Sequence, residues 1–432
     1  MQIRRAALAA WVIACAVAWP AAASDPKAGP PALTLDDAVS RIANTHPELR
    51  LFDARGAVLA AERDQAAQRP PLVAAVELEN AFGTGQARAL DAAELSLSLA
   101  SVLERGGKLD ARRSLAQARI DALAIERETR RLDLLAEAAR RYLGAVAAKA
   151  QRALAQADIE QRRRAVAAAR LRLQAGASPE SVLLTAQAAL ARAELALARA
   201  DQQALMARQH LAALWGERAP QFAVAAADPL RLPAIADAAA LATLLAQTPE
   251  LAQFADAQRI GEARLQLARS AEAVDLDWQL GLRRAQDSGD TALVAGLSLA
   301  LALGSRARAQ PGIRAAQAEL DVLNVEREAR GMALYATLVE AHGRYQLARL
   351  EVARLRDEVL PTLARAEAAA ERAYRAGAAS YLEWAQLQSE RTASRRQQLE
   401  VALDAQRALI ELQRLTGQPL LAAPITRQGH AE

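Results

Sequence analysis

The sequence predicts a mainly α-helical protein with a small β part, built from two similar halves. Residues 116–130 match residues 316–330 at nine of fifteen positions without a gap, which indicates an internal duplication with an offset of 200 residues. Each half contains two short stretches in which apolar and polar residues alternate, as they do in β-strands. Each half then continues into a helical stretch of about 65 residues that contains few glycines or prolines.

The duplication sets the expected domain organisation. After a signal peptide at residues 1–24, we expect a first structural repeat over 25–221, a second over 222–417 and a C-terminal tail at 418–432. The elements expected in the first repeat are a β-hairpin at 72–103, a long helix at 108–173 and a return helix at 179–215. Those expected in the second repeat are a β-hairpin at 274–303, a long helix at 313–375 and a return helix at 380–416.

The N-terminus has the pattern of a secretory signal peptide. Arg4 and Arg5 precede an apolar run over residues 6–18, and the small residues around Ala23 suit a cleavage site. Cys15, the only cysteine, offers an alternative, because cleavage before it would leave a lipidated N-terminus. No other segment reaches eighteen uninterrupted apolar residues, so we expect no transmembrane helix.

Composition argues against several functional classes. Charged residues make up 24% of the chain, their net charge is +4, and their signs alternate along the predicted helices, which disfavours a nucleic-acid-binding surface. The four histidines are dispersed and no paired cysteine or histidine motif occurs, so we expect no metal site and no cofactor. No nucleophile–base set or phosphate-binding loop stands out, so we expect no catalytic residues and no enzymatic activity.

Glycines are expected to end the long helices. Gly176 and Gly377 suit the left-handed position after a helix, and Pro179 suits the first turn of the helix that returns. In the first return helix, leucines recur every seven residues and alanines follow three residues after each, which is a heptad typical of a coiled coil with closely approaching helices. The residues of this heptad are Leu183, Ala186, Leu190, Ala193, Leu197 and Ala200.

Four strands per chain are too few to close a transmembrane barrel, since the smallest have about eight. An open sheet in lipid would leave its edge strands without hydrogen-bond partners. Three chains would supply twelve strands, so we expect a trimeric, 12-stranded transmembrane β-barrel whose apolar face meets lipid. The residues expected on the lipid-facing side are Val76, Leu78, Leu95, Leu97, Leu99, Leu276, Trp278, Leu280, Leu297 and Leu299.

Two motifs of the first repeat carry a resemblance to a known family. Glu77-Leu78-Glu79-Asn80 is followed by Gly83-Thr84-Gly85, and Leu103-Glu104-Arg105-Gly106-Gly107-Lys108 leads into the long helix. With these motifs and its duplicated layout, the chain resembles the TolC family of outer-membrane efflux proteins, and in particular the heavy-metal, CzcC-like branch.

This resemblance implies a homotrimer in the cell outer membrane that extends into the periplasm. Its β-barrel would continue as an α-helical barrel of long coiled-coil helices, and outer-membrane lipid would surround the β-barrel. The channel would be the passive exit duct of a tripartite RND-type efflux system for heavy-metal cations. Its partners would be a periplasmic adaptor (a membrane fusion protein) and an inner-membrane RND transporter. Two alternatives stay open: a TolC-like channel for drugs or type I protein secretion, and a periplasmic coiled-coil scaffold without a pore.

The resemblance also implies roles for residues near the ends of the long helices. Glu383 lies where relatives carry an acidic residue of the periplasmic gate, and a ring of three such carboxylates would favour cations. Arg375 is the second gate candidate, and we expect it to pair across the tip. The residues expected to dock the adaptor are Ala175, Gly176, Ala177, Ser178, Ala376, Gly377 and Ala378.

Overall fold

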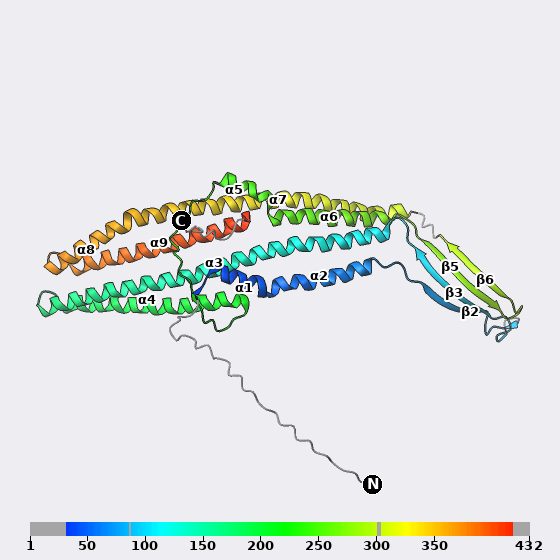
Figure 1. Cartoon of the computed structure of the whole chain (residues 1–432), viewed down its shortest axis with the longest axis horizontal. Coiled ribbons are helices and arrows are strands. Elements are labelled where there is room, and N and C mark those ends of the chain that lie inside the picture. Colours follow the sequence, from blue (N-terminus) through cyan, green and yellow to red (C-terminus); the bar gives the residue numbers. More distant parts are fainter. Residues whose placement is uncertain (1–31, 86–87, 300–303, 418–432) are drawn as a thin grey trace, which may run out of the picture.

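The molecule is elongated, with a β-sheet at one end and two helical hairpin tips at the other (Figure 1). The computed structural model describes residues 32–85, 88–299 and 304–417. The elements of its first half are β1 Ala32–Leu33, α1 Leu35–Thr45, α2 Pro47–Ala66, β2 Val73–Glu79, β3 Glu94–Leu103, α3 Lys108–Gln174, α4 Glu180–Ala212 and η2 Ala213–Trp215. Those of its second half are β4 Ala223–Val224, α5 Ala238–Leu244, η3 Leu245–Gln247, α6 Pro249–Ser270, β5 Leu276–Ala285, β6 Thr291–Ser298, α7 Ser305–Arg354, η4 Leu355–Val359, α8 Leu360–Ala376 and α9 Tyr381–Thr416.

The same order of elements occurs in both halves: a helix, two strands, a long helix and a return helix. The predicted mainly α-helical class with a few strands is confirmed. The cysteine proposed for lipidation, Cys15, lies outside the described residues.

The four longer strands form one antiparallel sheet in the order β2-β3-β5-β6, so the central pair joins one hairpin from each half. The register aligns Val76, Leu97, Leu282 and Leu293 in one row across all four strands. Because side chains alternate along a strand, this row and every second row belong to the same face. The adjacent row runs through Glu77, Ser96 and Arg283 and belongs to the other face.

The sheet therefore has one apolar and one polar face. Nine of the ten residues expected on the apolar side lie in its strands and share that face, and Leu299 follows directly after β6. Most of these side chains are exposed: Val76 is 71% exposed and Leu297 is 73% exposed, whereas Leu276 and Trp278 are half-buried. The expected continuation of the last strand, through Leu301 and Leu303, lies outside the described residues.

The motif around Gly106 and Gly107 connects the sheet to the helices. A side chain at Gly106 would place its Cβ 2.3 Å from the Cβ of Ala273, so only glycine allows this approach. Arg112 donates two hydrogen bonds to the Glu104 carboxylate, at 2.6 and 2.7 Å. Lys108 pairs with Asp275 at 2.7 Å, which ties the start of α3 to the turn before β5.

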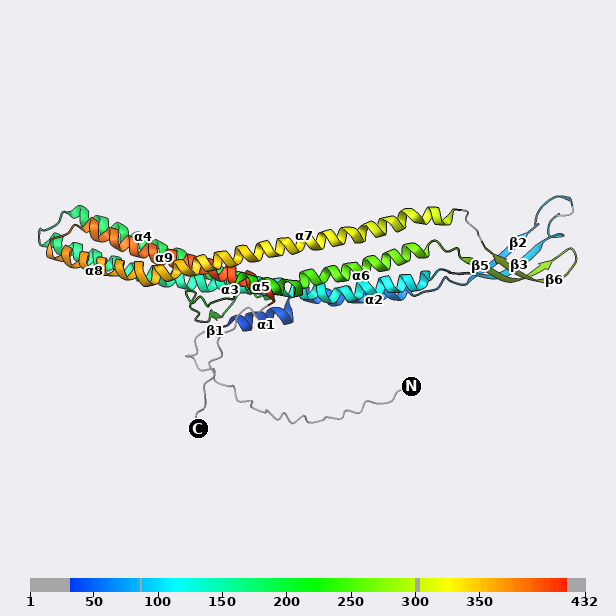
Figure 2. The same cartoon turned by 90° about the horizontal axis from the view of Figure 1, so that it is seen from above.

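The helices form a wall around α3, whose 67 residues extend roughly 100 Å. Near the sheet the neighbours follow the order α2-α3-α6-α7, and near the tips they follow the order α4-α3-α9-α8. Figure 2 shows the same arrangement from above, with α6 and α7 leading to the sheet. By length and apolar content alone, Glu180–Trp215 could cross a membrane, although we expected no such helix. It lies along α3 and buries Ala186, Ala193 and Ala200, which suits a coiled coil.

The second long helix differs from its prediction. It was expected to start at residue 313, after Pro311 and Gly312, but α7 begins at Ser305 and contains Pro311. A proline in the second turn removes one backbone hydrogen bond without ending the helix. Farther along, η4 is a π-helical turn in which the Leu360 N–H donates to the Leu355 carbonyl. This wider turn directly precedes Pro361, which has no N–H to donate.

A short parallel pair was missed by the sequence analysis. β4 lies just after the repeat boundary expected at residue 221, yet it pairs with β1 of the first half. Each of these strands has two residues, which is too short for an alternating pattern to be visible.

We predict that Glu104→Gln destabilises the protein at about pH 7 but not in acid. The hydrogen bond from Arg112 holds the pKa of the Glu104 carboxyl below its usual value of 4.5 in the folded state. The carboxylate therefore stabilises the fold above that value, and its contribution is lost as the pH falls through the lower folded pKa. The melting temperature of the helical circular dichroism signal in detergent should differ between wild type and variant at about pH 7, and the difference should shrink as the pH falls below 4.5. A difference that stays constant with pH, or one shared by Glu180→Gln, would contradict this assignment.

Candidate functional site

The two hairpin tips share one backbone design. The chain leaves α3 at Ala175 and leaves α8 at Ala376, and the next residues, Gly176 and Gly377, have φ values of +68° and +82°. At the first tip the Ala177 N–H donates to the Arg172 carbonyl at 2.8 Å, and the Gly176 N–H donates to the Leu173 carbonyl at 2.9 Å. The second tip repeats both bonds, which are those of a Schellman motif.

Arg172 connects the two tips. Its guanidinium donates to the Tyr374 carbonyl of the second hairpin, and to the Ala177 carbonyl at 3.1 Å and the Ser178 Oγ at 3.2 Å in the first. It also lies over the Tyr374 ring, 4.9 Å from the ring centroid. The planar, five-donor guanidinium suits such multiple contacts. The sequence analysis missed Arg172, because its main partner is about 200 residues away in the chain.

A cluster of buried aromatic side chains packs next to this contact. The rings of Tyr374, Tyr381 and Trp384 lie 5.4–6.5 Å apart and are buried between α3, α4, α8 and α9. Burial raises the pKa of the Tyr381 hydroxyl. Aromatic pairs of this geometry stabilise packing by about 0.5–1.5 kcal/mol beyond the buried area. Arg172 therefore contacts a well-packed aromatic cluster at the second tip.

The two predicted gate residues lie near this aromatic cluster but do not pair with each other. The Glu383 carboxylate is exposed on the first turn of α9, where its backbone N–H donates to the Ser380 Oγ at 3.2 Å. The expected pairing of Arg375 across the tip is wrong, because Arg375 pairs with Glu371 of its own helix at 2.6 Å. The i,i+4 spacing brings that carboxylate within reach on the same helix face.

A second polar network crosses from α3 to α9 farther from the tips. Arg162 donates to Asp158 and Gln388, both at 3.3 Å, and to Ser389 at 3.2 Å. Thr392 also donates to Asp158, at 3.3 Å. Asp158, Arg162 and Gln388 are buried, and buried polar groups of this kind need such partners. The sequence did not single out these positions, because the α3 and α9 residues of this network are more than 220 positions apart in the chain.

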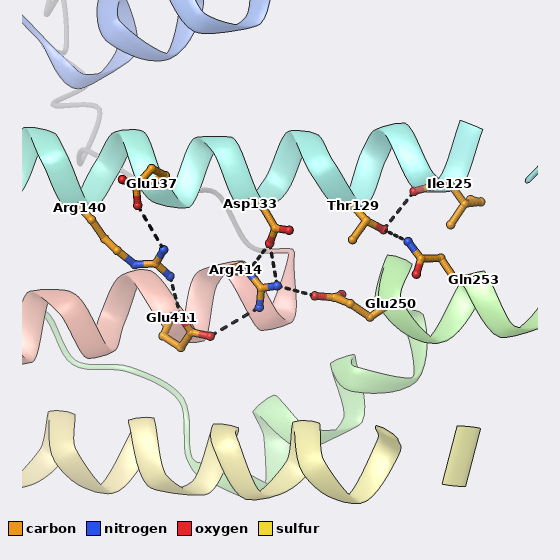
Figure 3. A network of polar contacts seen from close by, with 9 residues as sticks. All are labelled: Ile125, Thr129, Asp133, Glu137, Arg140, Glu250, Gln253, Glu411 and Arg414. Carbon is orange, nitrogen blue, oxygen red and sulfur yellow. Dashed lines mark hydrogen bonds and ion pairs between the residues drawn. The ribbon is translucent and has the colours of Figure 1, made fainter. Parts of the chain in front are cut away.

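A third network joins α3, α6 and α9 near the middle of the molecule (Figure 3). Arg414 pairs with Asp133 at 2.7 Å, with Glu250 at 3.0 Å and with Glu411 at 3.5 Å. Burial acts to lower the pKa of Arg414, but the hydrogen bond to Asp133 and the nearby carboxylates outweigh it and raise the pKa. Arg140 shares Glu411, at 2.8 Å.

The repeated Pro-Glu-Leu sequence explains part of this network. Glu48 and Glu250 occupy the same position at the starts of α2 and α6. Each pairs with an arginine of a neighbouring helix, Glu48 with Arg130 and Glu250 with Arg414. The duplicated motif therefore anchors each helix that leads toward the sheet.

Two of the described histidines have local structural roles. His46 Nδ1 accepts a hydrogen bond from the Glu48 N–H at the start of α2, and His342 Nε2 lies 3.1 Å from the Ala236 carbonyl. In the part of the chain that the structure describes, no three His, Cys, Asp or Glu side chains stand close enough together to hold a metal ion.

We predict that Arg172→Ala loosens the contact between the tips without unfolding the hairpins. Spin labels placed through Ala177→Cys and Ala378→Cys should give a broader distance distribution once Arg172 is removed, because three hydrogen bonds and the ring contact are lost. Arg172→Lys, which keeps the charge but not the planar fork, should give an intermediate width. Arg170→Ala removes an exposed arginine two residues earlier and should leave the distribution narrow. Equal widths for wild type and Arg172→Ala would show that Arg172 does not hold the tips together.

Comparisons with known proteins agree with this architecture. Residues 47–217 match the model of the family described as outer membrane efflux protein. The cobalt-zinc-cadmium resistance protein CzcC of Cupriavidus metallidurans is 28% identical over 288 residues, which cover 65% of this chain and 67% of that protein.

Solved channel structures share the fold. The structure of CusC superposes on this chain with a TM-score of 0.74 at 17% sequence identity. The superposition covers 89% of this chain and 92% of the CusC chain. The open state of the Neisseria gonorrhoeae MtrE outer membrane channel gives a TM-score of 0.71 at 17% identity, with 89% of each chain covered. Taken together, the chain is similar to outer membrane efflux proteins over residues 47–217 and shares the fold of solved outer membrane channels over most of its length, which agrees with a location in the outer membrane that extends into the periplasm.

Proposed function

We propose that three copies of this chain form a channel that serves as the passive exit duct of a tripartite RND-type efflux system. The observation that supports this most directly is the four-stranded sheet, whose β2 and β6 edges have no partner within the described chain and whose apolar face is exposed. Backbone groups in lipid must be paired, so these edges require other strands. Three sheets joined edge to edge give a closed barrel of twelve strands.

The helical wall supports the same assembly. Like the sheet, the wall is open at both sides. Its outermost helices are α2 and α7 near the sheet, and α4 and α8 near the tips. An exposed apolar stripe follows α7 at heptad-like spacing, which suits coverage by a helix of a neighbouring copy. The residues of this stripe include Val322, Val325, Met332 and Val339. A scaffold without a pore would leave both this stripe and the apolar sheet face in water.

We propose heavy-metal cations as the exported substrate. The relative CzcC is named as a cobalt-zinc-cadmium resistance protein. The polar face of the sheet is also acidic: Glu77, Glu79, Glu94 and Asp277 outnumber Arg283, which pairs with Glu79 at 3.5 Å and Glu94 at 3.0 Å. A lumen with this charge favours cations. The duct itself needs no catalytic group, since an inner-membrane RND transporter would supply the energy and a periplasmic adaptor would join the two at the tips.

Native mass measurement and conductance of the detergent-extracted protein test this proposal together. We expect a mass of three protomers, because closure of the barrel requires twelve strands, and we expect stable conductance after insertion into a planar bilayer. A monomer that keeps its full strand content in the absence of detergent would overturn the barrel.

The facing of the strands gives a second prediction. Leu97→Arg should place a charge in lipid and cost about 2–4 kcal/mol if the residue lies near the bilayer midplane. Ser98→Arg should place the same charge in the lumen and be tolerated better. The readout is the yield of heat-stable trimer in the outer membrane. Equal losses for both variants would mean that the two faces are assigned wrongly.

The proposed gate gives a third prediction. Three Glu383 carboxylates near the closed end of the channel would attract cations, so Glu383→Gln should lower cation selectivity and weaken block by multivalent cations added on the periplasmic side. Glu180→Gln removes an acid near the first tip and should change neither property in the same planar-bilayer recording. If Glu383→Gln also leaves both unchanged, Glu383 is a solvated helix residue and not a gate.

A further inference from the structure

A positively charged collar surrounds the place where the sheet meets the helices. It consists of the sheet-proximal ends of α2, α3, α6 and α7 with their adjoining turns, and we call it the junction collar. Its segments are residues 63–69, 104–113, 264–275 and 304–314. These contain eleven arginines and lysines against five aspartates and glutamates, a net charge of +6, whereas the entire chain carries +4. The rest of the molecule is therefore slightly acidic.

The acidic side chains of the junction collar are already engaged. Asp64 pairs with Arg63, Asp110 with Arg113, Glu104 with Arg112, and Asp275 with Lys108. Glu272 accepts a hydrogen bond from Gln310. Six exposed arginines are left that have no acidic partner within the described ranges of the chain. They are Arg69, Arg105, Arg269, Arg306, Arg308 and Arg314.

The junction collar lies directly beside the apolar face of the sheet. Trp278, the third residue of β5, occupies that face next to Ser101 and Leu297 and is half-buried. It is the only tryptophan in the four-stranded sheet. Tryptophan is enriched at the level of lipid headgroups, where its ring is in apolar surroundings and its N–H reaches polar groups. Trp278 therefore marks the boundary of the bilayer at the height at which the unpaired arginines begin.

We propose that the junction collar binds the headgroups of anionic phospholipids in the periplasmic leaflet of the membrane. The inference rests on the proposed function, because the sheet must lie in the bilayer for the junction collar to meet headgroups. Guanidinium groups bind phosphate oxygens through two parallel hydrogen bonds. Clusters of basic residues at a membrane boundary attract anionic lipids. The attraction acts on the charge of the headgroup. The lipid contact would set the depth at which the barrel sits.

The experiment uses the full chain reconstituted in vesicles of phosphatidylcholine and phosphatidylglycerol in equal amounts. After detergent extraction, mass spectrometry measures how much of each lipid co-purifies with the protein. We expect phosphatidylglycerol to be enriched, and we expect the triple variant Arg269→Gln, Arg308→Gln, Arg314→Gln to reduce the enrichment by at least about tenfold. The matched control, Arg192→Gln, Arg199→Gln, Arg208→Gln, removes the same charge from α4, far from the sheet, and should change it little.

A salt series on the wild-type protein provides a test that does not depend on the variants folding. Between about 0.1 M and about 1 M salt, the screening length falls from roughly 10 Å to roughly 3 Å, so the enrichment should be largely lost. A conducting channel that shows no phosphatidylglycerol enrichment at low salt, or equal losses in the two triple variants, overturns the lipid proposal and leaves the channel intact. Protein that does not conduct in a bilayer of the same lipid mixture overturns the proposed function instead.

Discussion

The pairing of β3 with β5 is the contact on which the rest of the architecture depends. It joins the two halves of a duplicated chain into one sheet and brings residues about 190 positions apart into register, such as Glu94 with Ala285. The same pairing uses the inner edges of both hairpins and leaves β2 and β6 at the outside. Since backbone groups in a membrane must be hydrogen-bonded, the proposed barrel would need other chains to supply strands at both edges. The proposed trimer therefore follows from the strand order of the sheet.

The helical part is held together differently. Its core is made largely of alanines, such as Ala138, Ala165 and Ala405, which bury little area each but let helices approach closely. Buried and half-buried arginines then fix which helices are neighbours. Arg414 does this in the middle of the molecule, Arg162 nearer the tips and Arg172 at the tips themselves. Because a buried charge is costly when it is unpaired, each network disfavours every arrangement that separates its members.

Function is distributed along the long axis of the molecule. The sheet offers an apolar outer face and an acidic inner face, the junction collar carries excess positive charge, and the tips end in two glycine turns linked by Arg172. In the proposed channel these regions would meet different environments: lipid, headgroups and a protein partner. A passive conduit would require this order of surfaces more than it would require any single reactive group.

The sequence by itself determined the features that depend on local periodicity. The alternating leucines of β3 and the glycines that end α3 and α8 identify elements correctly, because neighbouring residues decide them. The start of α7 was misplaced because Pro311 lies inside that helix and local rules interpreted it as a break. Only the tertiary structure decided that Arg172 spans the tips and that β4 joins β1. Such contacts join residues of unrelated local pattern across long stretches of chain, so their partners are chosen by how the helices pack and not by the sequence around them.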